Sequence, residues 1–327
     1  VMAADDHGTV TGTQRSFDRM LALSPEGCDV AKWECPRATS WMYVTSGLSD
    51  SQAAAYVKQG FDIGSHVSTY CHNWSEYSLD VTFADDLRSF RRSYPSLPPQ
   101  QGSRLHCIAW SDYVSQPRIE RAWGIRFDMN YYYWPPTWVR GRAGFMTGSG
   151  LPMRFSDVNG GLIDVYQQET HLVDEVFAGI IKAVAGLLDR ALGPEGYYGA
   201  FGTHYDFNHE FDAPLMKMAL KRRIPMVSAK QMLDWTDGRQ ASTFRTTAWT
   251  DGVLAFDVKA DGRVEKLLRG MLPMQAAGGR LREIRLSDKQ AVAFATETIK
   301  GIEYALFDAR SGSYLAVYDR QAHGSAR

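Results

Sequence analysis

The sequence predicts an α/β fold followed by a small all-β domain. Over the first 240 residues, short β-rich runs alternate with helical stretches, a pattern that indicates a parallel sheet or a β/α barrel. After Arg239 the pattern changes to short alternating runs separated by turn dipeptides such as Asp251-Gly252 and Asp261-Gly262. We therefore expect a barrel-like domain over 1–240, a β-sandwich over 241–320 and a disordered tail over 321–327.

The first domain is expected to contain eight strands and six helices in alternation. The predicted strands are 1–5, 41–45, 61–66, 105–110, 123–129, 162–166, 198–204 and 224–228. The predicted helices are 50–59, 80–93, 115–122, 170–192, 212–222 and 229–236. The helix over 50–59 has Ser49 or Asp50 as its expected N-cap and ends at Gly60.

Composition excludes two classes of partner. The 327 residues carry a net charge of −1, which argues against a nucleic-acid or anionic-membrane surface. Because the sequence has no uninterrupted apolar run long enough to cross a bilayer, we expect no transmembrane span. The chain starts without Met inside the first predicted strand, so we expect a mature or excised form of a longer product.

Four cysteines, at 28, 35, 71 and 107, suggest an oxidising compartment. Cys28 and Cys35 bracket a short loop that a local disulfide would suit, and Cys71 could then pair with Cys107. The alternative is four reduced thiols in a cytosolic enzyme. Because the sequence contains no CxxC pair, a structural zinc cluster is not expected.

The adjacent acids Asp5 and Asp6 end the first predicted strand and are followed by His7-Gly8. Two neighbouring carboxylates repel each other, and a divalent metal is the usual compensation. Strand alternation sends the two side chains in different directions, so one could bind an ion while the other addresses a water. The alternative interpretation is an acidic helix N-cap or loop.

Several polar residues lie near the carboxyl ends of the predicted strands, where barrel enzymes place their working groups. His66 and His72 follow the strand over 61–66, and with one carboxylate they would leave a metal position open for water. His204 could act as a general acid or could simply cap a loop. Asp128 could orient a histidine or cap the next loop. Arg104 lies instead at the start of the strand over 105–110, where it could hold a carboxylate or be solvated.

An aromatic-rich segment runs from Tyr131 to Trp138. Its rings could stack on sugar faces, or the segment could be a loop that covers the mouth of the barrel.

The order of these motifs resembles polysaccharide deacetylases of the NodB-homology type, the carbohydrate esterase family 4 and its relatives. The resemblance covers roughly 1–236 and implies a distorted (β/α)7 barrel. It rests on an Asp-Asp-x-Gly motif, a Gly-x-His motif with a second His downstream, an Arg segment, an Asp after a strand and a late strand ending in His. In this chain these are Asp5-Asp6, Gly64 to His66 with His72, Arg104, Asp128 and His204.

The resemblance implies a role for each of these residues. Asp5 would be the catalytic base, Arg104 would steady it, His204 would be the general acid and Asp128 would be the later acid of the family pattern. Asp6, His66 and His72 would bind Zn²⁺ or another divalent ion such as Ni²⁺ or Co²⁺. The family's metal-binding histidines are usually four residues apart, whereas His72 is six residues after His66. The third ligand is therefore His72, His106 or water.

The resulting prediction is a secreted or cell-surface, metal-dependent hydrolase that removes N- or O-acetyl groups from an acetylated polysaccharide. The alternative is a non-catalytic glycan-binding protein on a degenerate deacetylase barrel. A glycoside hydrolase would need two acids on different strands, which the adjacent Asp5 and Asp6 do not supply.

Overall fold

The computed structural model describes residues 1–107, 109, 111–130, 150–168, 171–174, 180–195, 199–207, 211–276 and 279–320. The chain forms two compact units. Unit 1 comprises Val1–Gly193 and Tyr197–Leu233, and unit 2 comprises Pro194–Gly196 and Asp234–Arg327. The division falls within helix α8 (Ala229–Ala241), slightly before the change in sequence character at 240.

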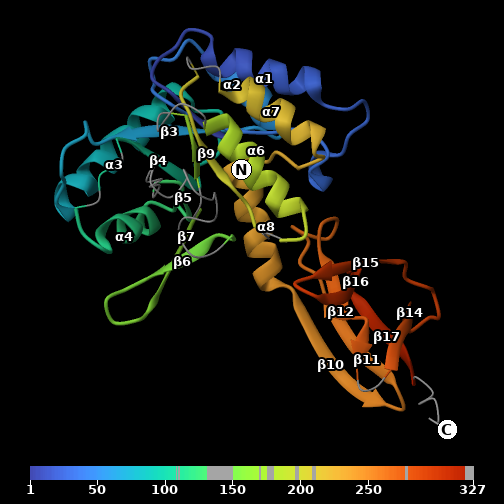
Figure 1. Cartoon of the computed structure of the whole chain (residues 1–327). Coiled ribbons are helices and arrows are strands. Elements are labelled where there is room, and N and C mark those ends of the chain that lie inside the picture. Colours follow the sequence, from blue (N-terminus) through green and yellow to red (C-terminus); the bar gives the residue numbers. More distant parts are fainter. Residues whose placement is uncertain are drawn as a thin grey trace. The chain divides into compact units, whose positions relative to one another are not determined.

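Unit 1 is a mixed α/β structure (Figure 1). Its strands are β1 (Ala3–Asp6), β2 (Thr39–Met42), β3 (Asp62–Ser68), β4 (Gly102–His106), β5 (Phe127–Asp128), β6 (Met153–Ser156), β7 (Leu162–Gln167), β8 (His171–Val173) and β9 (Gly202–His204). Its helices are α1 (Gly12–Leu23), η1 (Val30–Lys32), α2 (Asp50–Lys58), α3 (Glu76–Ser93), α4 (Ser115–Ala122), α6 (Ile180–Leu192), α7 (Asp212–Lys221) and the start of α8.

The strands of unit 1 are mainly parallel. One sheet has the order β1-β2-β3-β4-β5-β7-β6, in which β6 alone is antiparallel to its neighbour. Strands β8 and β9 form a second parallel pair. The segment after β9 continues alongside β1, because the Asp5 N–H donates to Tyr205 O at 2.9 Å and Asp5 forms a parallel bridge with Asp206. The carboxyl ends of β9, β1, β2, β3 and β4 therefore succeed one another around one edge.

Among the described residues, two of the apolar clusters of unit 1 hold helices against these strands. The larger includes Phe17 of α1, Tyr56 of α2, Leu187 of α6 and Leu215 of α7, together with residues of β1 and β2. The smaller joins α3 and α4 to β3 and β4 through residues such as Phe83, Ile119, Val67 and Leu105. Apolar burial of this kind contributes about 25 cal/mol per Å² and keeps the strand ends in fixed positions.

Unit 2 contains two antiparallel sheets. The strands are β10 (Thr243–Thr250), β11 (Val253–Lys259), β12 (Arg269–Pro273), β13 (Gln275–Ala276), β14 (Gly279–Leu286), β15 (Phe294–Ile299), β16 (Ile302–Asp308) and β17 (Gly312–Arg320). The sheet orders are β10-β11-β17-β14-β13 and β12-β16-β15. Both sheets contribute to one core, in which Phe256 stacks on Tyr314 and also contacts Phe307.

The coarse prediction, an α/β region followed by an all-β region, is confirmed. The N-cap prediction is also confirmed, because Ser49 and Gln52 form a capping box at the start of α2. Both disulfides are present as predicted, Cys28–Cys35 and Cys71–Cys107. No helix among the described residues is both long and apolar enough to cross a membrane.

Other element predictions were wrong. Helix α1 was missed, and the region predicted as a helix from 170 begins instead with β8. Residues 224–228 form no strand, although the Met2 N–H donates to Val227 O. The aromatic segment Tyr131–Trp138 and the tail 321–327 lie outside the described residues.

Candidate metal centre

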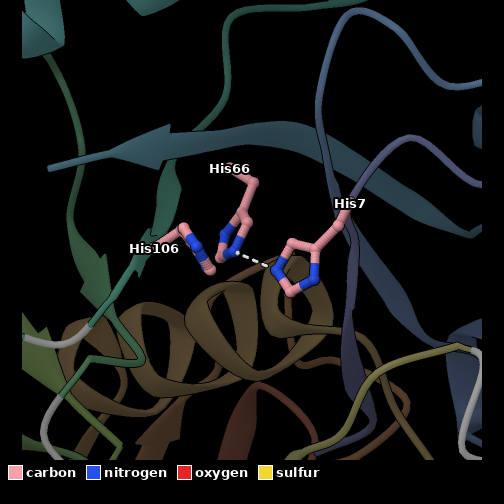
Figure 2. Close-up of side chains that lie close together, drawn as sticks. All are labelled: His7, His66 and His106. Atoms are coloured by element: carbon pink, nitrogen blue, oxygen red, sulfur yellow. Dashed lines mark hydrogen bonds between the residues drawn. The ribbon is translucent and has the colours of Figure 1, made fainter. Parts of the chain in front are cut away.

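Three histidines converge at the carboxyl ends of strands that are far apart in the sequence (Figure 2). His7 directly follows β1, His66 lies on β3 and His106 ends β4. One ring nitrogen from each of the three lies within 4.8 Å of the other two. Tyr43, directly after β2, packs beside them with ring-centroid distances of 5.4 Å to His66 and 5.5 Å to His7.

The ring orientation of His66 is set by the backbone of β4. His66 Nδ1 lies 3.1 Å from Arg104 O, and because a carbonyl only accepts, Nδ1 carries the hydrogen. Its Nε2 then presents a lone pair toward His7 Nε2, 3.1 Å away. Two nitrogens bound to one zinc at about 2.0–2.1 Å are roughly 3.3 Å apart in a tetrahedron, which is close to this separation.

Burial keeps the imidazoles of His66 and His106 in the form that binds metals. It lowers the pKa of His66 to about 3. Burial and, next, the neighbouring His7 also lower the pKa of His106. A neutral imidazole offers its lone pair to a cation, so near pH 7 these rings are suited to a borderline metal such as zinc.

Asp5 lies beside this triad and is almost fully buried. Its Oδ2 is 3.0 Å from His204 Nε2 and 3.7 Å from His66 Nε2. Its Oδ1 is 3.8 Å from Arg104 Nη1 and has no hydrogen-bond partner among the described residues. A buried carboxylate oxygen without a donor is costly, so an incoming ligand or ion at this position would be stabilised.

Charge keeps Asp5 ionised. Burial alone would raise the pKa of its carboxyl, but His66, Arg104 and His204 outweigh that effect and hold the pKa well below its ordinary value. Among these partners the arginine is the one whose charge persists at every physiological pH. The Arg104 guanidinium is itself positioned by Thr203 O, which accepts from Nη2 at 2.9 Å, and by His171 Nδ1 at 3.4 Å.

The structure thus brings Asp5, His66, Arg104 and His204 together, as the order of motifs predicted. It also brings in two residues that sequence reasoning did not use, His7 and Asp206. Asp206 Oδ1 lies 3.7 Å from His7 Nδ1, and Asp5, His7 and Asp206 form a second group of potential ligand atoms within 4.8 Å of one another.

Asp6 is a correction to the predicted ligand set, because its carboxylate is engaged elsewhere. Oδ1 accepts from the N–H and hydroxyl of Thr9 at 2.7 and 2.8 Å. Oδ2 accepts from the hydroxyl of Thr13 at 2.6 Å and from its N–H at 3.3 Å. Asp6 therefore holds the first turn of α1, which is the capping role considered as the alternative.

His72 is a second correction. Its side chain is exposed, and it does not belong to any of the groups of potential metal ligands found among the described residues. The backbone explains this, because Tyr70 and Cys71 both have positive φ and turn the chain before His72. His106, the alternative ligand, occupies the place instead.

Asp128 lies in a different polar cluster. Its Oδ2 accepts from Gln116 Nε2 at 2.9 Å, and its Oδ1 accepts from the Asn130 N–H at 2.7 Å. Burial and the proximity of Asp128 raise the pKa of Glu120 well above its ordinary value. Asp128 is thus one half of a buried carboxyl pair with Glu120.

No family model matches this chain. No curated protein matches it either. Among solved structures, a crystal structure of an Anoxybacillus α-amylase aligns with 86% of this chain and 67% of its own, at 10% identity and a TM-score of 0.23. A likeness of that size carries no argument about fold or function, so the site must be interpreted from its own chemistry.

Proposed function

We propose that this chain is a metal-dependent hydrolase that removes acetyl groups from a polysaccharide outside the cell. The observation that carries the proposal is the convergence of His7, His66 and His106 next to the buried, ionised Asp5. A divalent ion held by the three imidazoles would supply Lewis-acid activation of a water and of a carbonyl oxygen.

The residues around the triad are suited to proton transfer. Asp5 stays ionised because of Arg104, so it can accept a proton from an attacking water as a general base. His204, hydrogen-bonded to Asp5 Oδ2, can donate a proton to the leaving group. Thr203 O and His171 hold Arg104 in the orientation that faces Asp5.

The substrate class rests on the resemblance to NodB-type deacetylases. The parallel order of β9, β1, β2, β3 and β4, with polar groups at their carboxyl ends, is compatible with the distorted barrel which that resemblance implies. In this proposal the family's Asp-His-His ligand set is replaced by three histidines. The two disulfides favour an oxidising, extracellular compartment.

An acetate-release assay on a panel of acetylated oligosaccharides tests the proposal. We expect acetate release with zinc or cobalt, loss of release after treatment with a chelator, and recovery when the metal is added back. If acetate is not released from any substrate although the protein retains zinc, the deacetylase proposal is wrong. Binding of the same oligosaccharides without turnover would instead support a non-catalytic glycan-binding protein. This is the second candidate because Asp6, the metal ligand implied by the resemblance, is bonded to Thr9 and Thr13 at the start of α1.

A further inference from the structure

The two ring nitrogens of His7 face different groups. Nε2 is 3.1 Å from His66 Nε2, whereas Nδ1 is 3.7 Å from Asp206 Oδ1. A neutral imidazole carries one hydrogen, so only one of these two faces can present a donor. Which nitrogen carries it decides whether His7 offers a lone pair to the metal position or to Asp206.

Asp206 favours the arrangement that metal binding requires. If Nε2 carried the hydrogen, the Nδ1 lone pair would face a carboxylate oxygen, and two acceptors would oppose each other. If Nδ1 carries it, the N–H points to Asp206, and the Nε2 lone pair faces that of His66 3.1 Å away. A cation shared by these two nitrogens and His106 would stabilise that arrangement. A carboxylate behind a ligating histidine fixes the tautomer and ring orientation in many metal sites.

Asp206 is well placed to act in this way. Its side chain is 14% exposed, and its Oδ1 has no hydrogen-bond partner among the described residues. Its backbone is fixed by the bridge to Asp5 and by its N–H, which donates to Asp174 Oδ2 at 3.3 Å. His7, by contrast, is 32% exposed and follows the end of β1, so it needs an external group to hold its ring.

We propose that Asp206 is a positioning residue for the metal site, which holds His7 in the Nδ1–H tautomer so that Nε2 is available as a ligand. This inference rests on the proposed metal-dependent function, because it assumes an ion at the histidine triad. In this proposal the Asp206 carboxylate faces Nδ1 of His7, as the Arg104 carbonyl oxygen faces Nδ1 of His66.

Zinc titration of the full chain tests the inference. The protein is stripped with a chelator, and zinc affinity is measured by competition with a chromophoric chelator for wild type, Asp206→Asn, Asp206→Glu and the control Asp164→Asn. Asp164 is a carboxylate that pairs with Arg126 at 2.9 Å outside the site. We expect Asp206→Asn to bind zinc about 10- to 100-fold more weakly, Asp206→Glu to recover part of the affinity and Asp164→Asn to behave as wild type.

The outcomes separate the two proposals. If wild type binds zinc and Asp206→Asn binds it equally well, the role of Asp206 is wrong while the metal site stands. If wild type binds no zinc, cobalt or nickel, both proposals are wrong.

A measurement on wild type covers the case in which Asp206→Asn does not fold. Long-range ¹H–¹⁵N spectra of the zinc-loaded protein should show a protonated Nδ1 and a metal-bound Nε2 for His7. The opposite assignment would overturn the inference.

Discussion

Asp5 and Asp6 are neighbours with separate roles. Asp5 faces Arg104, His66 and His204, while Asp6 is occupied by the threonines at the start of α1. Alternation along β1 produces this separation, because successive side chains point to opposite sides of a strand.

Replacing Asp5 by Asn should abolish turnover without removing the metal. The substitution keeps the shape of the side chain but removes the base, so we expect acetate release to fall by about 10²- to 10⁴-fold. Zinc content measured on the same preparation should stay at the wild-type level. Full activity of Asp5→Asn would show that Asp5 is not the base.

Replacing Asp6 by Ala should affect stability and leave metal binding unchanged. The variant loses the acceptor for Thr9 and Thr13, so we expect a loss of about 1–2 kcal/mol in the free energy of unfolding, as for other helix caps. Urea unfolding and zinc titration measure the two effects separately. A large drop in zinc affinity with unchanged stability would restore Asp6 as a ligand.

The Glu120–Asp128 pair should make stability depend on pH in a characteristic direction. Because burial raises the pKa of Glu120 above its value in the unfolded chain, the stabilising contribution is present at low pH and is lost as pH rises. Glu120→Gln keeps the hydrogen-bonding shape without this loss. It should therefore be more stable than wild type at pH 8 by roughly 1–3 kcal/mol, with a smaller difference near pH 4.5. Equal stability of the two proteins at pH 8 would contradict this.

Residue-level prediction worked where a side chain marked the end of a strand. Asp5, His66 and His204 were found in this way, and each does lie at the common edge. Arg104 was expected at the start of the strand over 105–110, and it joins them because β4 spans Gly102–His106. Sequence reasoning gave His7 no role, although its position two residues after Asp5 indicates the same side of the strand. The same parity relates Arg104 to His106 on β4. The choice between His72 and His106 depended on the positive-φ turn at Tyr70 and Cys71, which the sequence does not reveal.

At the scale of elements, the Cys71–Cys107 disulfide joins the turn after β3 to the residue that follows His106. It therefore restrains two of the strand ends that carry the histidine triad. Cys28–Cys35 closes a local loop and offers a matched control.

Removing the Cys71–Cys107 disulfide should weaken the metal site. We expect the double variant Cys71→Ser/Cys107→Ser to bind zinc at least roughly tenfold more weakly, because His106 loses its restraint. Cys28→Ser/Cys35→Ser should keep the wild-type affinity. The comparison is made by zinc titration of both folded variants, and equal affinities would show that the disulfide does not support the site.

Helix α1 shows why some elements were not predicted. Its N-cap residue, Thr11, makes no side-chain cap hydrogen bond, and the acceptor for its first turn is Asp6, which lies well upstream. Thr11 is of a favoured capping type, but the first-turn N–H groups donate to Thr9 Oγ1 and Asp6 instead. The spacing of Phe17 and Met20, both buried, was the available signal. Strand β8 was missed for a different reason. The strongly helical sequence of α6 follows it, and the predicted helix was extended back over β8.

For the whole molecule, buried neutral histidines predict sensitivity to acid. Burial lowers the pKa of His66 to about 3 and that of His171 well below its ordinary value. The unfolded chain protonates these rings near pH 6.5 while the folded chain does not, so stability falls as the pH drops from about 6.5 toward about 3. In this window His66 contributes about 1.4 kcal/mol per pH unit, and His171 acts in the same direction.

Urea unfolding of the metal-free protein between pH 7 and 4 checks this expectation. His171→Gln removes one of the titrating rings without touching the triad, so its stability should fall less steeply than that of wild type. Equal slopes for wild type and His171→Gln over this range would show that His171 is not held neutral in the folded state.

The division of the chain into two units was predictable because strand and helix periodicities differ and turn dipeptides mark hairpins. The arrangement of strands around the site was harder to predict. The segment after β9 pairs with β1 through residues some 200 positions apart, such as Asp5 and Asp206. Contacts of that kind arise from packing of the whole unit and leave no local pattern.

The account depends most on the claim that one divalent ion is bound by His7, His66 and His106. The most direct test is the zinc stoichiometry and affinity of wild type, His106→Ala and His72→Ala, measured on the full chain. We predict one tightly bound zinc in wild type and His72→Ala, and loss of tight binding in His106→Ala. Loss of tight binding in His72→Ala with retention in His106→Ala would contradict the account.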